Sequence, residues 1–258
     1  MSIARNIAFA GGHVAKFFAA HRVRWSEFYP SEHFIFERLA GPERRFGKVL
    51  DVGCAVGGLG LALEERFSVG RYVGVEISRK AIDAARVLAK EGRFRCPVAF
   101  HAGDILATDA VEGGPFDLVV ALSSADWNIE TDAILRACWD NVAPGGTFVM
   151  SLRLTDGRSL NDISRSYQEL RYEEGEAPER ANYVVFGVRE ILRLFEGFSP
   201  RASNVLGYGT WGPPSRTAVT PYHRLCFTVF AVTKAKAPAG EIATELHFPA
   251  SLWSGVET

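Results

Sequence analysis

Residues Val49 to Leu63 read Val-Leu-Asp-Val-Gly-Cys-Ala-Val-Gly-Gly-Leu-Gly-Leu-Ala-Leu. The stretch starts as an apolar run rich in branched residues, which predicts a buried parallel strand. It then breaks into small residues and resumes at Leu59 as the start of a helix. A strand, a glycine-rich turn and a helix in this order bring backbone N–H groups against a ligand. We therefore expect the rest of the chain to be organised around this stretch.

Strands and helices alternate along the chain after the glycine-rich turn. We expect helices after Ser78, over 131–142 and over 187–196, and strands over 71–77, 97–101, 116–122, 147–152, 201–208 and 224–233. Alternation at this spacing predicts an α/β fold with a doubly wound, Rossmann-like, mostly parallel sheet. We expect seven strands, with the last two forming an antiparallel C-terminal hairpin.

We interpret the chain as one domain with two additions. Residues 1–45 are expected to form an N-terminal helical cap, with one helix over 2–20 and a second helix that Ser31 caps. Residues 46–233 form the ligand-binding domain, and 234–258 a peripheral tail.

The second half of the chain changes character. Residues 154–186 are polar and charged, which predicts an insertion that contacts the substrate, with a helix around 159–172. Residues 207–217 are too rich in Gly and Pro for regular structure.

Composition narrows the class of protein. A chain of 258 residues can bury one sizeable core, and its net charge of −1 gives no electrostatic reason to expect nucleic acid or membrane as the main partner. No apolar run approaches the ~20 residues of a membrane helix. The four cysteines are far apart in sequence, which fits a reducing cytoplasm and argues against a zinc ribbon or a disulfide scaffold.

Asp51 stands two residues ahead of Gly53, and with it the opening stretch resembles the first motif of class I S-adenosylmethionine (SAM)-dependent methyltransferases. The resemblance covers roughly 48–152 and includes the turn Pro144-Gly145-Gly146. Many members have glycine where this chain has Ala55. The resemblance implies SAM as cofactor and a cofactor site formed by Asp51, Gly53, Cys54, Ala55, Gly57, Glu76, Ile77, Asp104, Ile105, Leu122 and Ser123.

Each part of that cofactor has a candidate partner. Small residues in the glycine-rich turn let the backbone approach the methionine and ribose portions, and Glu76 can accept hydrogen bonds from both ribose hydroxyls. Asp104, with the N–H of Ile105, suits the adenine edge. Leu122 and Ser123 end a strand beneath the methionine part.

Methyl transfer from a sulfonium is an in-line displacement, and positioning contributes most of its acceleration. A general base is needed only where the acceptor must lose a proton. The main candidates for the base are His223 and Asp126, and two further candidates are His33 and His101. No carboxylate pair resembles a divalent-metal site, so we expect no metal.

The acceptor has no known signature in this chain. We expect Tyr29, Trp127, Arg153, Tyr208 and Trp211 to bind it, and Arg153 with Arg216 could hold a polar or anionic group. The runs 152–155, 161–167, 208–215 and 217–221 resemble uncharacterised bacterial methyltransferases found with surface-glycan biosynthesis. This resemblance implies O- or N-methylation of a small-molecule or glycan-linked acceptor. The oligomeric state is left open, with a homodimer as one option.

Two other functions fit parts of the sequence. Gly53-x-Ala55-x-x-Gly58 followed by Glu76 comes close to the fingerprint of a nicotinamide or flavin dinucleotide site. That fingerprint does not require Asp51 and does not predict Gly103-Asp104. A methyltransferase-like fold that binds without turnover is the third alternative, because a fold alone does not establish activity.

Overall fold

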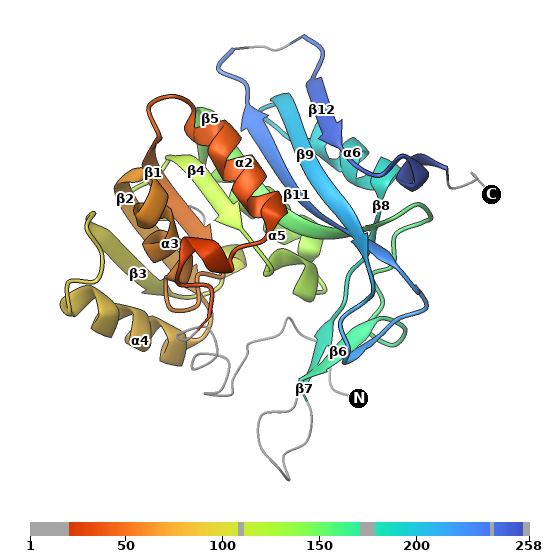
Figure 1. Cartoon of the computed structure of the whole chain (residues 1–258), viewed down its shortest axis with the longest axis horizontal. Helices are drawn as coiled ribbons and strands as arrows, with labels where there is room; N and C mark the ends of the chain where they lie inside the picture. The colour runs from red at the N-terminus through yellow and green to blue at the C-terminus, as the bar shows by residue number, and fades with distance from the viewer. Residues whose placement is uncertain (1–20, 108–110, 171–178, 238–239, 255–258) are drawn as a thin grey trace.

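The protein is described by a computed structural model that covers residues 21–107, 111–170, 179–237 and 240–254. Within these residues the largest element is a nine-stranded sheet, in which eight strands follow the order β12-β9-β11-β5-β4-β1-β2-β3 and β8 pairs with β5 (Figure 1). The expected helix over 2–20 lies outside the described residues.

The first five strands are parallel neighbours, as the alternating pattern predicts. They are β1 (Arg45–Val52), β2 (Ser68–Glu76), β3 (Val98–Ala102), β4 (Phe116–Ala121) and β5 (Val142–Thr155). The strand β11 (Leu225–Lys234) runs antiparallel to both β5 and β9 (Ala202–Gly212). The predicted Rossmann-like, mostly parallel sheet with an antiparallel C-terminal hairpin is confirmed.

Two further strands extend this sheet beyond the seven expected. The strand β8 (Phe186–Gly187) has only two residues, too few to produce a sequence pattern. The strand β12 (Ala243–His247) comes from the segment that we expected to be a tail, and it adds to the sheet edge parallel to β9. A short turn of helix (Ala250–Trp253) follows and buries Leu252 completely. The end of the described chain therefore belongs to the packed structure.

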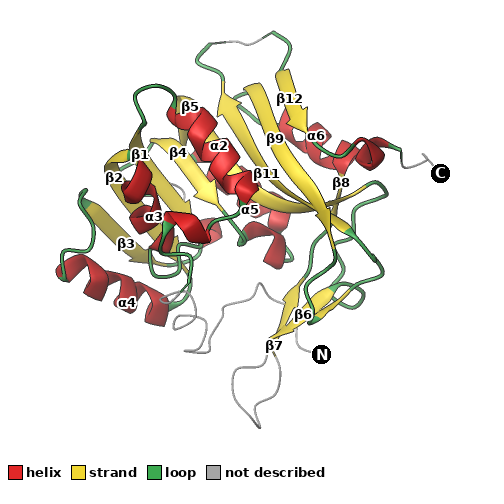
Figure 2. Cartoon of the chain, in the orientation of Figure 1, coloured by secondary structure: helices red, strands yellow, loops and turns green. Residues whose placement is uncertain are grey.

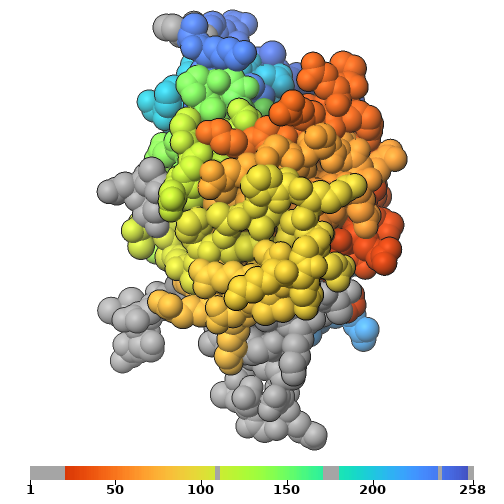
Figure 3. Space-filling model, turned by 90° about the vertical axis from the view of Figure 1, so that its left-hand side faces the viewer, coloured from red at the N-terminus to blue at the C-terminus, as the bar shows by residue number. Residues whose placement is uncertain are grey.

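Helices cover both faces of the sheet (Figure 2). One face packs against α2 (Pro30–Ala40), α3 (Gly58–Arg66) and α4 (Arg79–Lys90), and the other against α5 (Thr131–Asp140) and α6 (Val188–Glu196). Successive strand residues divide between the two layers, as the pleat requires: Val49 belongs to the first and Leu50 to the second. Figure 3 views the molecule from the β3 edge, where α4 lies at the surface. No helix in the described residues is both long enough and apolar enough to cross a membrane.

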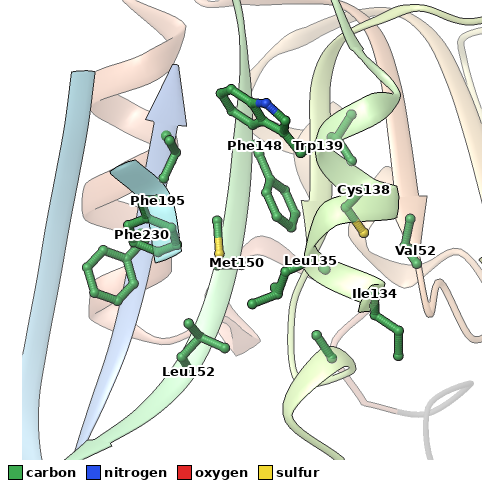
Figure 4. Packing of buried hydrophobic residues seen from close by; sticks show 14 of the residues in the cluster. Val52, Ile134, Leu135, Cys138, Trp139, Phe148, Met150, Leu152, Phe195 and Phe230 are labelled. Carbon is green, nitrogen blue, oxygen red and sulfur yellow. The ribbon is translucent and has the colours of Figure 1, made fainter. Parts of the chain in front are cut away.

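The layer beneath α5 and α6 is rich in aromatic contacts (Figure 4). Trp139 of α5 stacks on Phe198 with ring centroids 4.6 Å apart, and Phe195 of α6 meets Phe230 of β11 edge-on at 5.1 Å. These contacts hold β5 and β11 in a rigid core. This core therefore fixes the positions at which the loops at the strand ends begin.

A second, small sheet has the order β10-β6-β7 and is built from β10 (Ala218–Val219), β6 (Tyr167–Leu170) and β7 (Glu179–Asn182). The helix expected around 159–172 was therefore wrong. Asp162 organises a turn instead, because its side chain accepts a hydrogen bond from the N–H of Ser164 and its carbonyl accepts one from the N–H of Ser166. Such local bonds compete with helix formation.

The Gly/Pro-rich stretch also differs from its prediction, since β9 continues regularly to Gly212. Its glycines permit close packing: a Cβ at Gly207 would lie 2.7 Å from the Phe248 ring, and one at Gly209 would lie 2.5 Å from Thr228. The small residues of this stretch thus mark close approach inside a strand.

Candidate functional site

A cavity of about 1320 Å³ lies at the carboxyl ends of the parallel strands. The segments that line it include residues 21–29, the glycine-rich turn with the ends of β2 and β4, the turn at 103–105, residues 125–128, and the small sheet with residues 215–217. Open α/β sheets bind their ligands at this edge. The main sheet therefore forms one wall of the cavity, and the small sheet forms part of another.

The glycine-rich turn folds back onto β2. The N–H groups of Gly53 and Cys54 both donate to the carbonyl of Val75, at 2.8 and 3.2 Å. The backbone is left-handed at Gly53 (φ 77°), Ala55 (φ 48°) and Gly57 (φ 81°). Ala55 is the residue of these three that carries a side chain, so this turn holds backbone strain at Ala55.

The glycines of this turn are needed for contacts within the protein. A Cβ at Gly53 would lie 2.5 Å from the Cβ of Ser124, and a Cβ at Gly57 would lie 2.9 Å from the Phe100 ring. We expected both residues to make room for the cofactor. Gly53 lines the cavity and Gly57 does not, so packing against neighbouring segments explains Gly57.

Glu76 ends β2 and projects into the turn. Its Oε2 accepts a hydrogen bond from the N–H of Ala55 at 3.1 Å, and its Oε1 accepts one from the N–H of Ser78 at 2.9 Å. Burial raises the pKa of Glu76, and these backbone N–H groups oppose the rise. Because each oxygen holds a second lone pair, the carboxylate can still accept hydrogen bonds from a ligand.

Asp51 is almost completely buried, yet it borders the same cavity. The hydroxyl of Tyr72 donates to its Oδ2 at 2.5 Å. Burial raises the pKa of Asp51 to about 7, the charge of Glu76 adds to the rise, and the Tyr72 hydrogen bond opposes it. Two carboxyl groups thus share this end of the cavity, both with a raised pKa.

The turns after β3 and β4 complete this end of the cavity. The Oδ1 of Asp104 accepts a hydrogen bond from the N–H of Leu106 at 2.9 Å, and Ile105 is buried beside it. Ser123 is left-handed (φ 50°), and its N–H donates to the Ser151 hydroxyl at 2.6 Å. Both turns are held by side-chain hydrogen bonds, so the cavity is largely preformed here.

The segment before α2 closes the cavity from the N-terminal side. Arg22 pairs with the buried Glu32 at 2.7 Å and stacks over the rings of Phe28 and Tyr29, with distances of 4.3 and 5.3 Å to the ring centroids. The helix α2 begins at Pro30, and its cap is Tyr29 in place of the expected Ser31 because proline suits the first helical position. Tyr29 lines the cavity and remains 62% exposed.

Trp127 also borders the cavity, and a buried ion pair supports it. The Nε of Arg153 lies 3.1 Å from the Oδ2 of Asp126 and 3.1 Å from the carbonyl of Val184, to which it donates. The guanidinium stacks on Trp127 and on Tyr183, at 4.5 and 3.7 Å from the ring centroids. Burial raises the pKa of Asp126, and the positive charge of Arg153 opposes the rise.

A family model described as a methyltransferase domain matches residues 45–183, just over half of the chain. This chain belongs to the methyltransferase family. SAM is the cofactor that the family uses, and the matched region contains the glycine-rich turn, Glu76 and Trp127.

Curated relatives of this methyltransferase act on several kinds of acceptor. It is 30% identical over 112 residues to trans-aconitate 2-methyltransferase from Deinococcus radiodurans, covering 43% of this chain and 40% of that protein. It is 30% identical over 149 residues to a ubiquinone biosynthesis O-methyltransferase from Psychrobacter arcticus, covering 58% and 49%. It is also 27% identical over 133 residues to ajmaline N-methyltransferase from Rauvolfia serpentina, covering 52% and 43%. The aligned part of the methyltransferase thus spans less than half the length of each.

Solved structures share the fold. A SAM-dependent methyltransferase from Methanosarcina mazei has a TM-score of 0.58 at 17% identity, covering 81% of this chain and 99% of that one. Another from Clostridium acetobutylicum has a TM-score of 0.54 at 13% identity, covering 86% and 99%. The fold of class I SAM-dependent methyltransferases is therefore confirmed.

The residues expected to bind cofactor lie together in the methyltransferase. Ten of the eleven line the cavity, and Gly57 is the exception. The residues that do so are Asp51, Gly53, Cys54, Ala55, Glu76, Ile77, Asp104, Ile105, Leu122 and Ser123. The family resemblance was enough to predict that they lie together, because each stands at or just beyond a strand end; their binding of cofactor stays a prediction.

The expected acceptor and base residues are mostly elsewhere. Tyr29, Trp127 and Arg216 line the cavity. The other expected residues do not; they are Arg153, Tyr208, Trp211, Asp126 and His223. Arg153 and Asp126 are paired with each other away from the cavity. Tyr208 packs on Phe34, and Trp211 donates a hydrogen bond to the Ser251 hydroxyl. His223 is exposed.

His33 and His101, the two further candidates for a base, also lie outside the cavity. His33 stacks on Trp25 with ring centroids 4.4 Å apart, and its Nε2 lies 2.8 Å from the Trp25 carbonyl. This contact gives His33 a structural role at the docking of α2.

Sequence reasoning named Arg216 but missed the other cavity residues of the small sheet and its neighbouring loop. Gln168, Glu169 and Leu170 of β6 line the cavity together with residues 215–219. No motif marks the β6 residues, and β6 has no alternation of buried and exposed residues that would predict a strand. In the described part of the chain, no group of three or more His, Cys, Asp or Glu side chains is arranged to hold a metal ion.

Proposed function

We propose that this protein binds SAM in the described cavity and transfers its methyl group to a small-molecule acceptor. The observation that carries the proposal is the Glu76 carboxylate, held between the N–H groups of Ala55 and Ser78 at the glycine-rich turn. Both oxygens retain the capacity to accept hydrogen bonds from two adjacent hydroxyls, as a ribose offers.

The other residues of this edge suit the remaining parts of SAM. The backbone of the turn at 53–55 would hold the methionine portion, and Asp104 with the N–H of Ile105 would hold the adenine edge. Ile77, which is 38% exposed at the cavity, offers apolar surface for a flat base. Bound SAM supplies a methyl group on a positively charged sulfur, which a nucleophile can displace.

The protein's own contribution to the reaction is orientation. A cavity of about 1320 Å³ has room for a cofactor and a small acceptor, since ligand sites commonly measure about 300–1,000 Å³. Aligning the acceptor atom with the methyl group can contribute about 7–11 kcal/mol to the lowering of the barrier. The substrate insertion at 154–186 supports this reading because β6 lines the cavity.

The atom methylated is proposed as oxygen or nitrogen. The O-methyltransferase and the N-methyltransferase among the relatives support both chemistries. Tyr29 and Val219 line the cavity and are both exposed, which supports a glycan-linked acceptor that extends to the protein surface. A homodimer and the exclusion of nucleic-acid acceptors stay predictions from the sequence.

Calorimetric titration with SAM, S-adenosylhomocysteine, NAD and FAD tests the proposal. We expect SAM and S-adenosylhomocysteine to bind with one-to-one stoichiometry, and NAD and FAD to give no signal. Binding of NAD or FAD alone would mean a dinucleotide site at Gly53, Gly58 and Glu76. If none of the four ligands binds, the cofactor assignment is rejected and a scaffold role is favoured.

A further inference from the structure

We infer that the acceptor is a hydroxylated ring acid, which means a ring compound with at least one hydroxyl and one anionic group. Gln168, Trp127 and Arg216 would recognise it at the acceptor end of the cavity. This inference rests on the proposed methyl transfer and deepens it. Three independent observations carry it.

The first observation is an unpartnered oxygen. Gln168 lines the cavity from β6, and its Oε1 is buried without a hydrogen-bond partner. Its cross-strand neighbours are Ala218 on β10 and Ala181 on β7, and neither side chain can donate a hydrogen bond. A buried acceptor left in this state costs stability. Rotation of the side-chain amide into the cavity, which Gln168 already lines, would let this oxygen meet a donor there. A hydroxyl group of the acceptor supplies that donor.

The second observation is the support of Trp127. Its ring borders the cavity, while the Arg153 guanidinium lies 4.5 Å from its centroid and the Tyr183 ring packs edge-on at 5.7 Å. These contacts hold the ring in one orientation. A rigid indole beside a hydroxyl-binding amide suits the apolar face of a ring, either aromatic or saturated.

The third observation is a cation without a counter-ion. Arg216 lines the cavity at its exposed rim, and it forms no ion pair with any residue that the structure describes. The other arginine of the cavity wall, Arg22, is already paired with Glu32. An anionic substituent on the acceptor can therefore be met by Arg216, through bonds that a guanidinium makes well with carboxylate or phosphate.

Two matched pairs of probes test the inference on the full-length protein saturated with S-adenosylhomocysteine. The pairs are 3,4-dihydroxybenzoate with catechol, and glucuronate with glucose. Each pair differs by one anionic group, and the two pairs separate a flat ring from a saturated one. We expect the acid of at least one pair to bind about tenfold more tightly than its neutral partner, as one charge-assisted hydrogen bond would give.

Three variants assign this preference to residues. Arg216→Gln should reduce the ratio of acid to neutral affinity to about one, whereas Arg201→Gln, an exposed arginine outside the cavity, should preserve it. Gln168→Leu should weaken both members of the pair equally, because they share the hydroxyl. The Gln168→Leu protein should unfold at the same temperature as the wild type or higher, whereas a purely structural role for Gln168 would lower that temperature.

The failures of the two proposals are distinguishable. If S-adenosylhomocysteine binds but neither acid binds more tightly than its neutral partner, the acceptor class is wrong and the methyltransferase assignment stands. If Arg216→Gln keeps the preference for the acid, the anion subsite is wrong. If S-adenosylhomocysteine itself fails to bind, the proposed function is rejected.

Discussion

The Tyr72 hydroxyl on β2 donates a 2.5 Å hydrogen bond to the Asp51 carboxyl on the neighbouring strand β1. This bond lies directly beneath the glycine-rich turn and links the two strands that carry most of the proposed cofactor site. It also lowers the pKa of a carboxyl that burial raises to about 7.

The raised pKa of Asp51 has a consequence for stability. In the unfolded chain an aspartate ionises near pH 4, whereas the native carboxyl keeps its proton until about pH 7. Between these values the native state binds more protons, so the contribution of Asp51 to stability falls as pH rises. Asp51→Asn should therefore gain stability relative to wild type between pH 5 and 8, by up to about 3 kcal/mol.

Urea unfolding of Asp51→Asn and wild type at pH 5 and at pH 8 measures this gain in stability. Asp83→Asn on the exposed surface of α4 serves as the control and should show no such change between the two pH values. An equal difference between Asp51→Asn and wild type at pH 5 and pH 8 would contradict the assigned pKa.

Ala55 adopts a left-handed backbone that favours glycine. Ala55→Gly should raise the free energy of unfolding by about 0.5–1 kcal/mol, because relief of strain exceeds the added entropy of the unfolded chain. Ala62→Gly, buried within α3, is the control and should destabilise by about 1 kcal/mol or more. Chemical denaturation compares them, and the same loss of stability in both variants would show that Ala55 is unstrained.

Glu76 and Glu64 form a natural matched pair. Both carboxylates are buried and accept backbone N–H groups, from Ala55 and Ser78 in one case and from Arg95 and Cys96 in the other. Only Glu76 lines the cavity. Glu76→Ala should weaken SAM binding about a hundredfold, as expected when two hydrogen bonds to a charged group are lost.

Glu64→Ala should lower stability and leave SAM affinity unchanged. Calorimetry and thermal unfolding on both variants separate the two effects. Equal SAM affinity in Glu76→Ala and wild type would contradict the proposal that Glu76 binds the ribose.

The buried pair Arg153–Asp126 should act mainly on stability. Arg153→Met leaves the Asp126 carboxyl buried without its counter-charge, which typically costs about 3–5 kcal/mol. The double variant Arg153→Met/Asp126→Asn should recover part of that loss, because it removes both charges. A double-mutant cycle by chemical denaturation measures the coupling.

Additive effects in this cycle would mean that the pair does not couple. A catalytic role for Asp126 would appear differently, as lost methyl transfer in an Asp126→Asn protein that is as stable as the wild type.

The clustering of the proposed cofactor residues could be predicted from sequence because their signals are local. The strand before Gly53, the acidic residue that ends β2 and the Gly103-Asp104 turn each stand within a few residues of a strand end. The order of these elements along the chain then determines that they meet at one edge of a parallel sheet.

The acceptor side could not be predicted in the same way. Gln168 reaches the cavity through pairing of β6 with β7 and β10, and β10 lies about fifty residues away in sequence. Arg153 and Asp126 each looked suitable for the site, and their mutual pairing depends on contacts with Val184 and Tyr183 that no local pattern records. Polar β12 lacked the alternation that marks a strand, because it lies at an exposed sheet edge.

The small sheet is built from two excursions, which are the connecting segments between Thr155 and Phe186 and between Gly212 and Leu225. Neither excursion contributes a strand to the nine-stranded sheet, whose pairing between β5, β11 and β9 is complete without them. If these two segments hold the acceptor as proposed, acceptor range can diverge between descendants of this chain through changes confined to them. For protein engineering, the same separation favours grafting both segments together, because β6 and β10 pair with each other across the two excursions.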